Sequence, residues 1–103
     1  MSNIATALTT LADPTRRAVF EKLSEGEASV GELTACLPVS QPAVSQHLAA
    51  LRNAGLVTVR SEGTRRIYQI DPTGLGPLRS WLDQFWDVQL AAYRAAAEGR
   101  DTP

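Results

Sequence analysis

Residues 40–53 carry short polar and small side chains whose chemistry suits contact with the edges of nucleic-acid bases. A glutamine side chain can pair with adenine through two hydrogen bonds, and a serine hydroxyl can bond to a base or to phosphate. Alanine adds little bulk, so it lets a helix approach closely in a DNA groove. We therefore predict that this segment contacts DNA through Ser40, Gln41, Ala43, Ser45 and Gln46, with Gln41, Ser45 and Gln46 as donors and acceptors and Ala43 giving clearance.

Positive charge is concentrated in the middle third of the chain. The whole chain has a formal net charge of −1, yet residues 41–70 contain four arginines and a single glutamate, and the segments on either side are net negative. Arginines that neutralise DNA phosphates supply affinity that is independent of base sequence and that weakens with salt. We therefore predict phosphate contacts from Arg52, Arg60, Arg65 and Arg66.

Other classes of function compete with this interpretation. The polar face could be an ordinary solvated helix surface, or it could dock another protein, although docking would leave the arginine cluster unexplained. An enzyme is not expected, because the chain has one histidine, one cysteine, no phosphate-binding loop and no paired acid and base.

Helix-start signals divide the first third of the chain. Apolar residues at spacings of three and four predict a helix over 3–12, and Asp13 followed by Pro14 predicts the start of a second helix. Ser29 and Glu32 have the spacing of a capping box, which predicts the start of a third helix.

The fourth predicted helix contains the polar segment described above. Ser40 is its expected N-cap and Gly55 its expected stop. At about 100° per residue, one side of this helix is apolar and faces the core, through Val44, Leu48 and Leu51. The third and fourth helices together span 29–54 and have the layout of a helix-turn-helix.

After Gly55 the hydrophobic period changes from that of a helix to that of a strand. Residues 57–70 alternate between apolar and polar side chains around Gly63, which predicts a β-hairpin wing, and residues 74–98 predict a long final helix. The predicted class is mainly α with a β-hairpin wing (α+β), in the order α-α-α-α-β-β-α, and 1–103 form one winged helix-turn-helix domain.

The long final helix carries an apolar and aromatic stripe. A helix this apolar at the end of a small domain needs a partner surface, so we expect the core of a dimer rather than a ligand pocket. The stripe consists of Leu78, Trp81, Leu82, Phe85, Trp86 and Tyr93.

Residues 8–72 resemble the winged helix-turn-helix of the ArsR/SmtB family of bacterial transcriptional repressors. The motifs that carry the resemblance are "ADPTRRAVFEKL", "SQPAVSQHLAALRNAGLV" and "RSEGTRRIYQI". The resemblance implies a repressor that binds an inverted repeat in a promoter, usually including its own. It also implies a homodimer formed by the first and last helices (3–12 and 74–98), through Ile4, Leu8, Leu11, Leu78, Trp81, Leu82, Phe85 and Trp86.

The third helix departs from the metal-sensing members of that family. Those members carry the motif "ELCVCDLC", whose thiolates bind Zn, Cd or As(III) strongly. Aligned on the following "SQP", this chain has Ser29, Gly31 and Thr34 at the cysteine positions, and no histidine follows His47 for the family's other metal site. The lone Cys36 has no partner for an intramolecular disulfide. We therefore expect a regulator that uses no metal and no other cofactor.

A few further expectations concern single residues and location. His47 is expected to be half-buried and bonded to the backbone of the turn, with a contact to a DNA base as the alternative. Of Arg16 and Arg17, at least one is expected to pair with an acid, and the other could touch phosphate.

No apolar run approaches the roughly 18 residues that cross a bilayer, and no signal peptide is evident, so a cytoplasmic protein without a membrane partner is expected. The sequence indicates no particular small-molecule effector.

Overall fold

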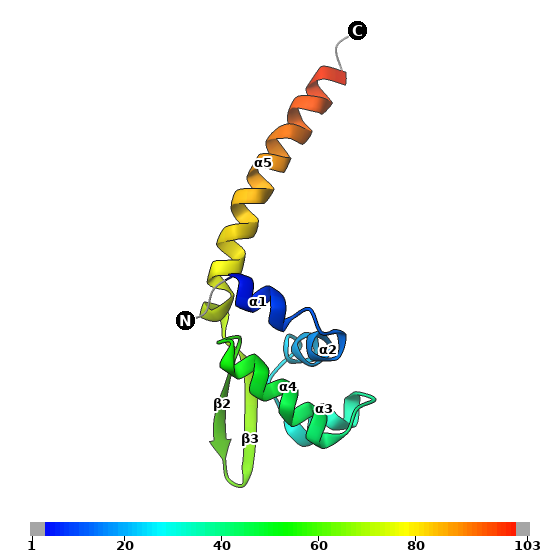
Figure 1. Cartoon of the computed structure of the whole chain (residues 1–103), viewed down its shortest axis with the longest axis vertical. Helices are drawn as coiled ribbons and strands as arrows, with labels where there is room; N and C mark the ends of the chain where they lie inside the picture. Colours follow the sequence, from blue (N-terminus) through cyan, green and yellow to red (C-terminus); the bar gives the residue numbers. More distant parts are fainter. Residues whose placement is uncertain (1–3, 101–103) are drawn as a thin grey trace.

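The computed structural model describes residues 4–100, so residues 1–3 and 101–103 of the predicted domain, and residue 3 of the predicted first helix, lie outside the described residues. The predicted class is confirmed: helices dominate, and a β-hairpin follows the fourth (Figure 1). In chain order the elements are α1 (Ile4–Thr10), α2 (Pro14–Leu23), β1 (Ala28–Ser29), α3 (Val30–Cys36), α4 (Gln41–Asn53), β2 (Val57–Glu62), β3 (Arg65–Ile70), the 3-10 turn η1 (Pro72–Leu75) and α5 (Gly76–Arg100).

The predicted helix boundaries rest on polar caps that the structure contains. The side chains of Asp13 and Ser40 each accept a hydrogen bond from the backbone N–H three residues on, at 2.9 and 3.3 Å. Ser29 and Glu32 form the reciprocal capping box at the start of α3. Gly55, with a φ of 77°, follows α4 in a left-handed conformation that favours glycine.

A short strand that the sequence analysis did not predict joins the helices to the hairpin. β1 contains only Ala28 and Ser29, and it pairs antiparallel with β3 opposite Tyr68 and Ile67. The sheet order is therefore β1-β3-β2. A two-residue strand shows no alternation for a sequence pattern to detect, and Ser29 already carries the signal of a helix cap. This pairing fixes the wing, residues 57–70, to the helical part of the molecule.

α4 crosses the hydrophobic core. Its predicted apolar side, Val44, Leu48 and Leu51, has no solvent exposure and belongs to one cluster with Val19, Leu33 and Leu56. α2 and α3 pack against this helix, and the wing lies beside it (Figure 1). The opposite side of α4 is therefore left outward, next to the wing.

α5 extends away from the other elements. Its 25 residues give a length of about 37 Å, and the described molecule measures 67 × 29 × 21 Å. The first part of α5 packs against α1 and η1, and the remainder projects beyond them (Figure 1). No described helix is both long and apolar enough to cross a membrane.

Candidate nucleic-acid interface

The outward face of α4 presents the predicted base-reading side chains. Gln41, Ser45 and Gln46 are exposed, and Ala43 is half-buried between them and the core. Ser40 is also exposed, but its hydroxyl oxygen is engaged as the N-cap of α4. The face is therefore polar and low in bulk, as close approach to base edges requires.

A groove of about 670 Å³ runs between α4 and β3. We call it the α4–β3 groove; its lining residues are Val30, Ser45, Ala49, Arg52, Asn53, Arg66 and Tyr68. Ser45, Arg52 and Arg66 are predicted site residues, whereas Asn53 and Tyr68 are not among the residues that the sequence predicts. Asn53 could have been predicted, because it is adjacent to Arg52 in the last turn of α4. Tyr68 could not, because only the packing of β3 against the helices brings it to the groove.

Two of the four predicted phosphate-binding arginines are available in this groove. Arg52 and Arg66 are exposed, and neither forms an ion pair with another described residue. They come from α4 and β3, on either side of the groove. A strand of DNA backbone lying in the α4–β3 groove would meet both guanidinium groups.

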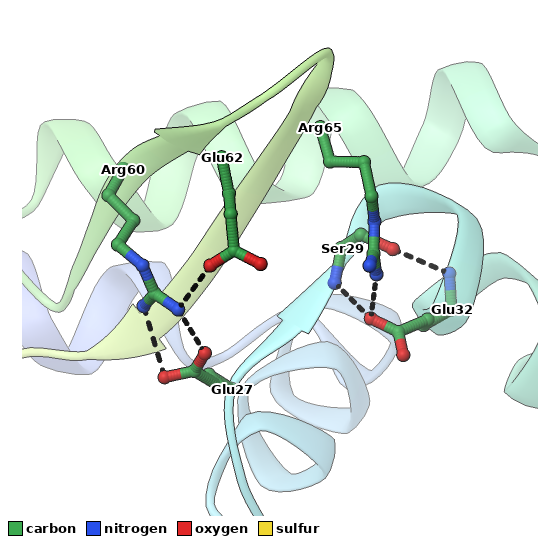
Figure 2. Close-up of polar contacts among 6 residues, drawn as sticks. All are labelled: Glu27, Ser29, Glu32, Arg60, Glu62 and Arg65. Atoms are coloured by element: carbon green, nitrogen blue, oxygen red, sulfur yellow. Dashed lines mark hydrogen bonds and ion pairs between the residues drawn. The ribbon is translucent and has the colours of Figure 1, made fainter.

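The other two arginines are held by carboxylates on the wing and near β1 (Figure 2). Arg60 forms a two-pronged contact with Glu27, with one nitrogen–oxygen distance of 3.0 Å, and a third contact of 3.1 Å with Glu62. Arg65 donates to Glu32 at 2.9 Å. These ion pairs are half exposed, so solvent and other charges can reach them.

The carboxylates in these pairs are stabilised in their charged form. Hydrogen bonds from Arg60 hold the pKa of Glu27 below its usual value. The pKa of Glu32 is lowered mainly by hydrogen bonds from the backbone and side chain of Ser29, and further by Arg65. Neither glutamate could be predicted as a partner from the sequence, because both reach the wing through the β1–β3 pairing, which no local pattern indicates.

Comparison with known proteins identifies the family of this chain. Residues 13–59 match the model of the bacterial regulatory protein family arsR. The HTH-type transcriptional regulator Rv2034 of Mycobacterium tuberculosis is 56% identical to this chain over 94 residues, which cover 89% of this chain and 88% of that protein. The chain belongs to the ArsR family.

Other ArsR-type relatives extend the likeness to repressors and to solved structures. The biofilm growth-associated repressor of Agrobacterium fabrum is 44% identical over 69 residues, covering 67% of this chain and 59% of that one. A crystal structure described as a possible transcriptional regulator for arsenical resistance has a TM-score of 0.69 and 45% identity, covering 82% of this chain and 93% of that one. This ArsR-family chain is thus a DNA-binding transcriptional regulator.

The positions of the family's metal-binding cysteines are occupied here by residues with structural tasks. The Ser29 hydroxyl accepts from the Glu32 backbone N–H at 3.2 Å, and the Thr34 hydroxyl donates to the Val30 carbonyl at 2.8 Å. Gly31 has no side chain to offer. Within residues 4–100, no group of three or more His, Cys, Asp or Glu side chains is placed to hold a metal ion. The residues present therefore do not fit the thiolate site of metal-sensing ArsR proteins.

The predicted dimer residues form an apolar surface on α1 and α5 of this ArsR-family chain. Trp81, Leu82, Phe85 and Trp86 are between 43% and 60% exposed, Leu8 is exposed, and Ile4, Leu11 and Leu78 are half-buried. The rings of Trp81 and Phe85 stack with centroids 6.1 Å apart. Val88, Leu90 and Tyr93, farther along α5, are exposed as well, and of these only Tyr93 belongs to the predicted stripe.

Three side chains behave differently from their sequence-based expectations. His47 is half-buried as expected, but its Nδ1 is buried without a hydrogen bond to any described residue. Arg16 and Arg17 bind backbone carbonyls of Thr10 and Leu11, at 3.4 and 3.1 Å, instead of pairing with an acid. The expectation of an acid partner was wrong because the last carbonyls of α1 lack partners within their helix and attract cations.

Proposed function

We propose that this protein is a homodimeric, metal-independent repressor that binds an inverted repeat in a promoter, including that of its own gene. The single observation that carries the proposal is the outward face of α4, whose exposed Gln41, Ser45 and Gln46 lie beside a groove with two arginines that form no ion pair with another described residue. In this proposal α4 enters the major groove and its polar side chains contact base edges.

Phosphate contacts come from both sides of the recognition helix. Arg52 and Arg66 neutralise the backbone that lies in the α4–β3 groove, and Arg60 and Arg65 do so from the wing once they leave their glutamates. Ser40 and Ala43, at the start of α4, lie closest to the base edges together with Gln41. These contacts supply both register and salt-dependent affinity.

In the proposed dimer, each of the two subunits contributes one recognition helix α4. The exposed apolar stripe on α5, with Leu8 on α1, supports a second copy as the partner, since a contiguous apolar surface of this kind is characteristic of interaction sites. In a two-fold dimer the recognition helices lie about 34–36 Å apart, one turn of DNA, and the operator mirrors the symmetry of the protein.

The proposal of metal independence rests on Ser29 and Thr34, which stand at the cysteine positions of metal-sensing members and whose hydroxyl groups form local hydrogen bonds. The side chain of Cys36 is exposed and is the one thiol in the chain. We therefore assign no metal, no other cofactor and no catalytic step to the protein, and we place its action in the cytoplasm, where the promoter lies.

Binding to a duplex from upstream of the protein's own gene tests the proposal. The expected result is a saturable complex at low salt that is tighter than the complex with a scrambled duplex of the same composition, and that is unchanged by a metal chelator. No complex at low salt would contradict the repressor assignment and favour a protein-docking role. Equal affinity for both duplexes would mean that α4 does not read sequence.

A further inference from the structure

We propose that Glu27 and Glu32 compete with DNA phosphates for the wing arginines and so lower the affinity of the protein for non-specific DNA. This inference rests on the proposed function, because it concerns how the same interface engages DNA. It adds two acidic residues, outside α4 and the wing, as determinants of specificity.

Glu32 holds Arg65 while serving a second purpose. Its Oε1 accepts from the backbone N–H of Ser29 at 2.9 Å and from Arg65 at 2.9 Å (Figure 2). The capping box therefore fixes the carboxylate at the start of α3, where the helix dipole also favours a negative charge. Arg65 is therefore paired with a carboxylate that a backbone hydrogen bond holds in place.

Arg60 is surrounded by more negative charge than it can neutralise. It contacts Glu27 through two nitrogens and Glu62 through one (Figure 2). The two-pronged geometry is the one that an arginine also adopts with phosphate. Arg60 and Arg65 together contact three glutamates, so this cluster of five side chains has one more negative charge than positive charges.

Arg52 and Arg66 provide the contrast within the same interface. They have no ion pair with a described residue and are ready for phosphate at first contact. A phosphate that takes Arg65 must instead displace Glu32 and then tolerate the carboxylate left beside it. Non-specific DNA makes no base contacts that could offset the loss of the Arg65–Glu32 ion pair. An operator adds base contacts from α4, and these offset the loss.

The test measures binding of a random-sequence 24-base-pair duplex by fluorescence anisotropy between 50 and 200 mM salt. Glu32→Gln removes the charge but keeps an acceptor that can serve the capping box. The expected result is tighter binding at 50 mM salt and a salt dependence steeper by about one phosphate, which makes the affinity fall about 3.5-fold more over this range. Glu27→Gln should act in the same direction through Arg60.

Glu21→Gln is the matched control, because Glu21 is exposed on α2 and makes no ion pair with a described residue. It changes net charge by the same amount and should leave the salt slope unchanged. Equal slopes for Glu32→Gln, Glu27→Gln and Glu21→Gln would overturn the inference. Weaker binding of Glu32→Gln would also overturn it, since the pair would then position the wing for DNA.

A double variant isolates the route through the arginine. In an Arg65→Ala background, Glu32→Gln should no longer steepen the salt slope, because the cation that it would release is gone. A persistent effect would show that Glu32 acts by general repulsion and not through Arg65. Failure of the unmodified protein to bind any duplex at 50 mM salt would reject the proposed function itself, whereas binding with unchanged variant slopes would reject this inference alone.

Discussion

Gly74 and Gly55 meet backbone to backbone: a Cβ atom added at Gly74 would lie 1.7 Å from the carbonyl oxygen of Gly55. The contact joins η1 to the turn that follows α4. The nearby hydrogen bond from the Asp71 N–H to the Leu56 carbonyl, at 2.9 Å, ties the same two segments together. The exit of the wing is thus fixed to the end of the recognition helix by a site that accepts only glycine.

Gly74→Ala should lower the free energy of unfolding by about 3 kcal/mol, because neither backbone can move away without breaking this contact. Urea unfolding at fixed protein concentration measures the change. Gly99→Ala is the control, since Gly99 is exposed within α5 and nothing lies within 4 Å of its added Cβ, and it should be neutral or stabilising by up to about 1 kcal/mol. Similar losses for both variants would rule out the contact as the cause.

Gln46→Ala should cost about 1–3 kcal/mol of binding at the operator and relax the base preference there, because its amide is exposed on the outward face of α4. Competition between single-base operator variants measures both effects. Gln84→Ala, an exposed glutamine on α5, should change neither. An equal loss on random-sequence DNA would reassign Gln46 to contact with the DNA backbone.

Arg66→Ala should reduce the salt slope by about one on operator and on random-sequence DNA alike, because Arg66 lies in the α4–β3 groove and no carboxylate within residues 4–100 pairs with it. Arg65→Ala should reduce it by about one on the operator only, since Glu32 holds Arg65 in the non-specific complex. Anisotropy titrations at several salt concentrations measure the slopes. An unchanged slope for Arg66→Ala on both duplexes would remove the groove from the DNA contacts.

Phe85→Glu should convert the proposed dimer to a monomer, because Phe85 is 56% exposed at the centre of the apolar stripe and a buried charge there has no partner. Light scattering at micromolar concentration should give about 22 kDa for the unmodified protein, twice the chain mass of 11.1 kDa, and half of this for the variant. Ser80→Glu, exposed on the same helix, should remain dimeric. A monomeric unmodified protein would refute the dimer.

Asp13 should make the stability of the fold depend on acid pH. The backbone N–H of Arg16 is the main cause that lowers the pKa of Asp13 below its usual value of 3.8. Its stabilising contribution is therefore complete above pH 3.8 and is lost as the pH falls through the lowered folded-state pKa. Asp13→Asn keeps an N-cap without a titrating group, so its urea midpoint should fall less between pH 4 and pH 2. Parallel curves for the two proteins would contradict this role.

Local signals in the sequence were sufficient for most of the fold. Caps such as Asp13 and Ser40 act on N–H groups three residues away, and the buried stripe of α4 repeats every three or four residues, so both can be inferred without tertiary information. The hairpin follows in the same way from alternation around Gly63. The predicted apolar stripe of α5 has this spacing too, whereas the exposed Val88 and Leu90 point about 200° apart around the helix and flank the stripe.

The electrostatic state of the site could not be inferred in that way. Glu27 and Arg60 are 33 residues apart in the chain, as are Glu32 and Arg65. Their contact depends on the register of a two-residue strand against β3. The sequence therefore indicated four equivalent arginines. In the fold, Arg52 and Arg66 line the α4–β3 groove without an ion pair to a described residue, whereas Arg60 and Arg65 are paired with glutamates.

Because α5 is long, distances along it can report how the two subunits of the proposed dimer are oriented. Ala95 is exposed ten residues beyond Phe85, which corresponds to about 15 Å along the helix. If two copies cross at Phe85, spin labels at Ala95 lie about 30 Å apart when the helices run antiparallel, and about 10 Å apart when they run parallel. One distance distribution thus determines the direction in which the two subunits face each other.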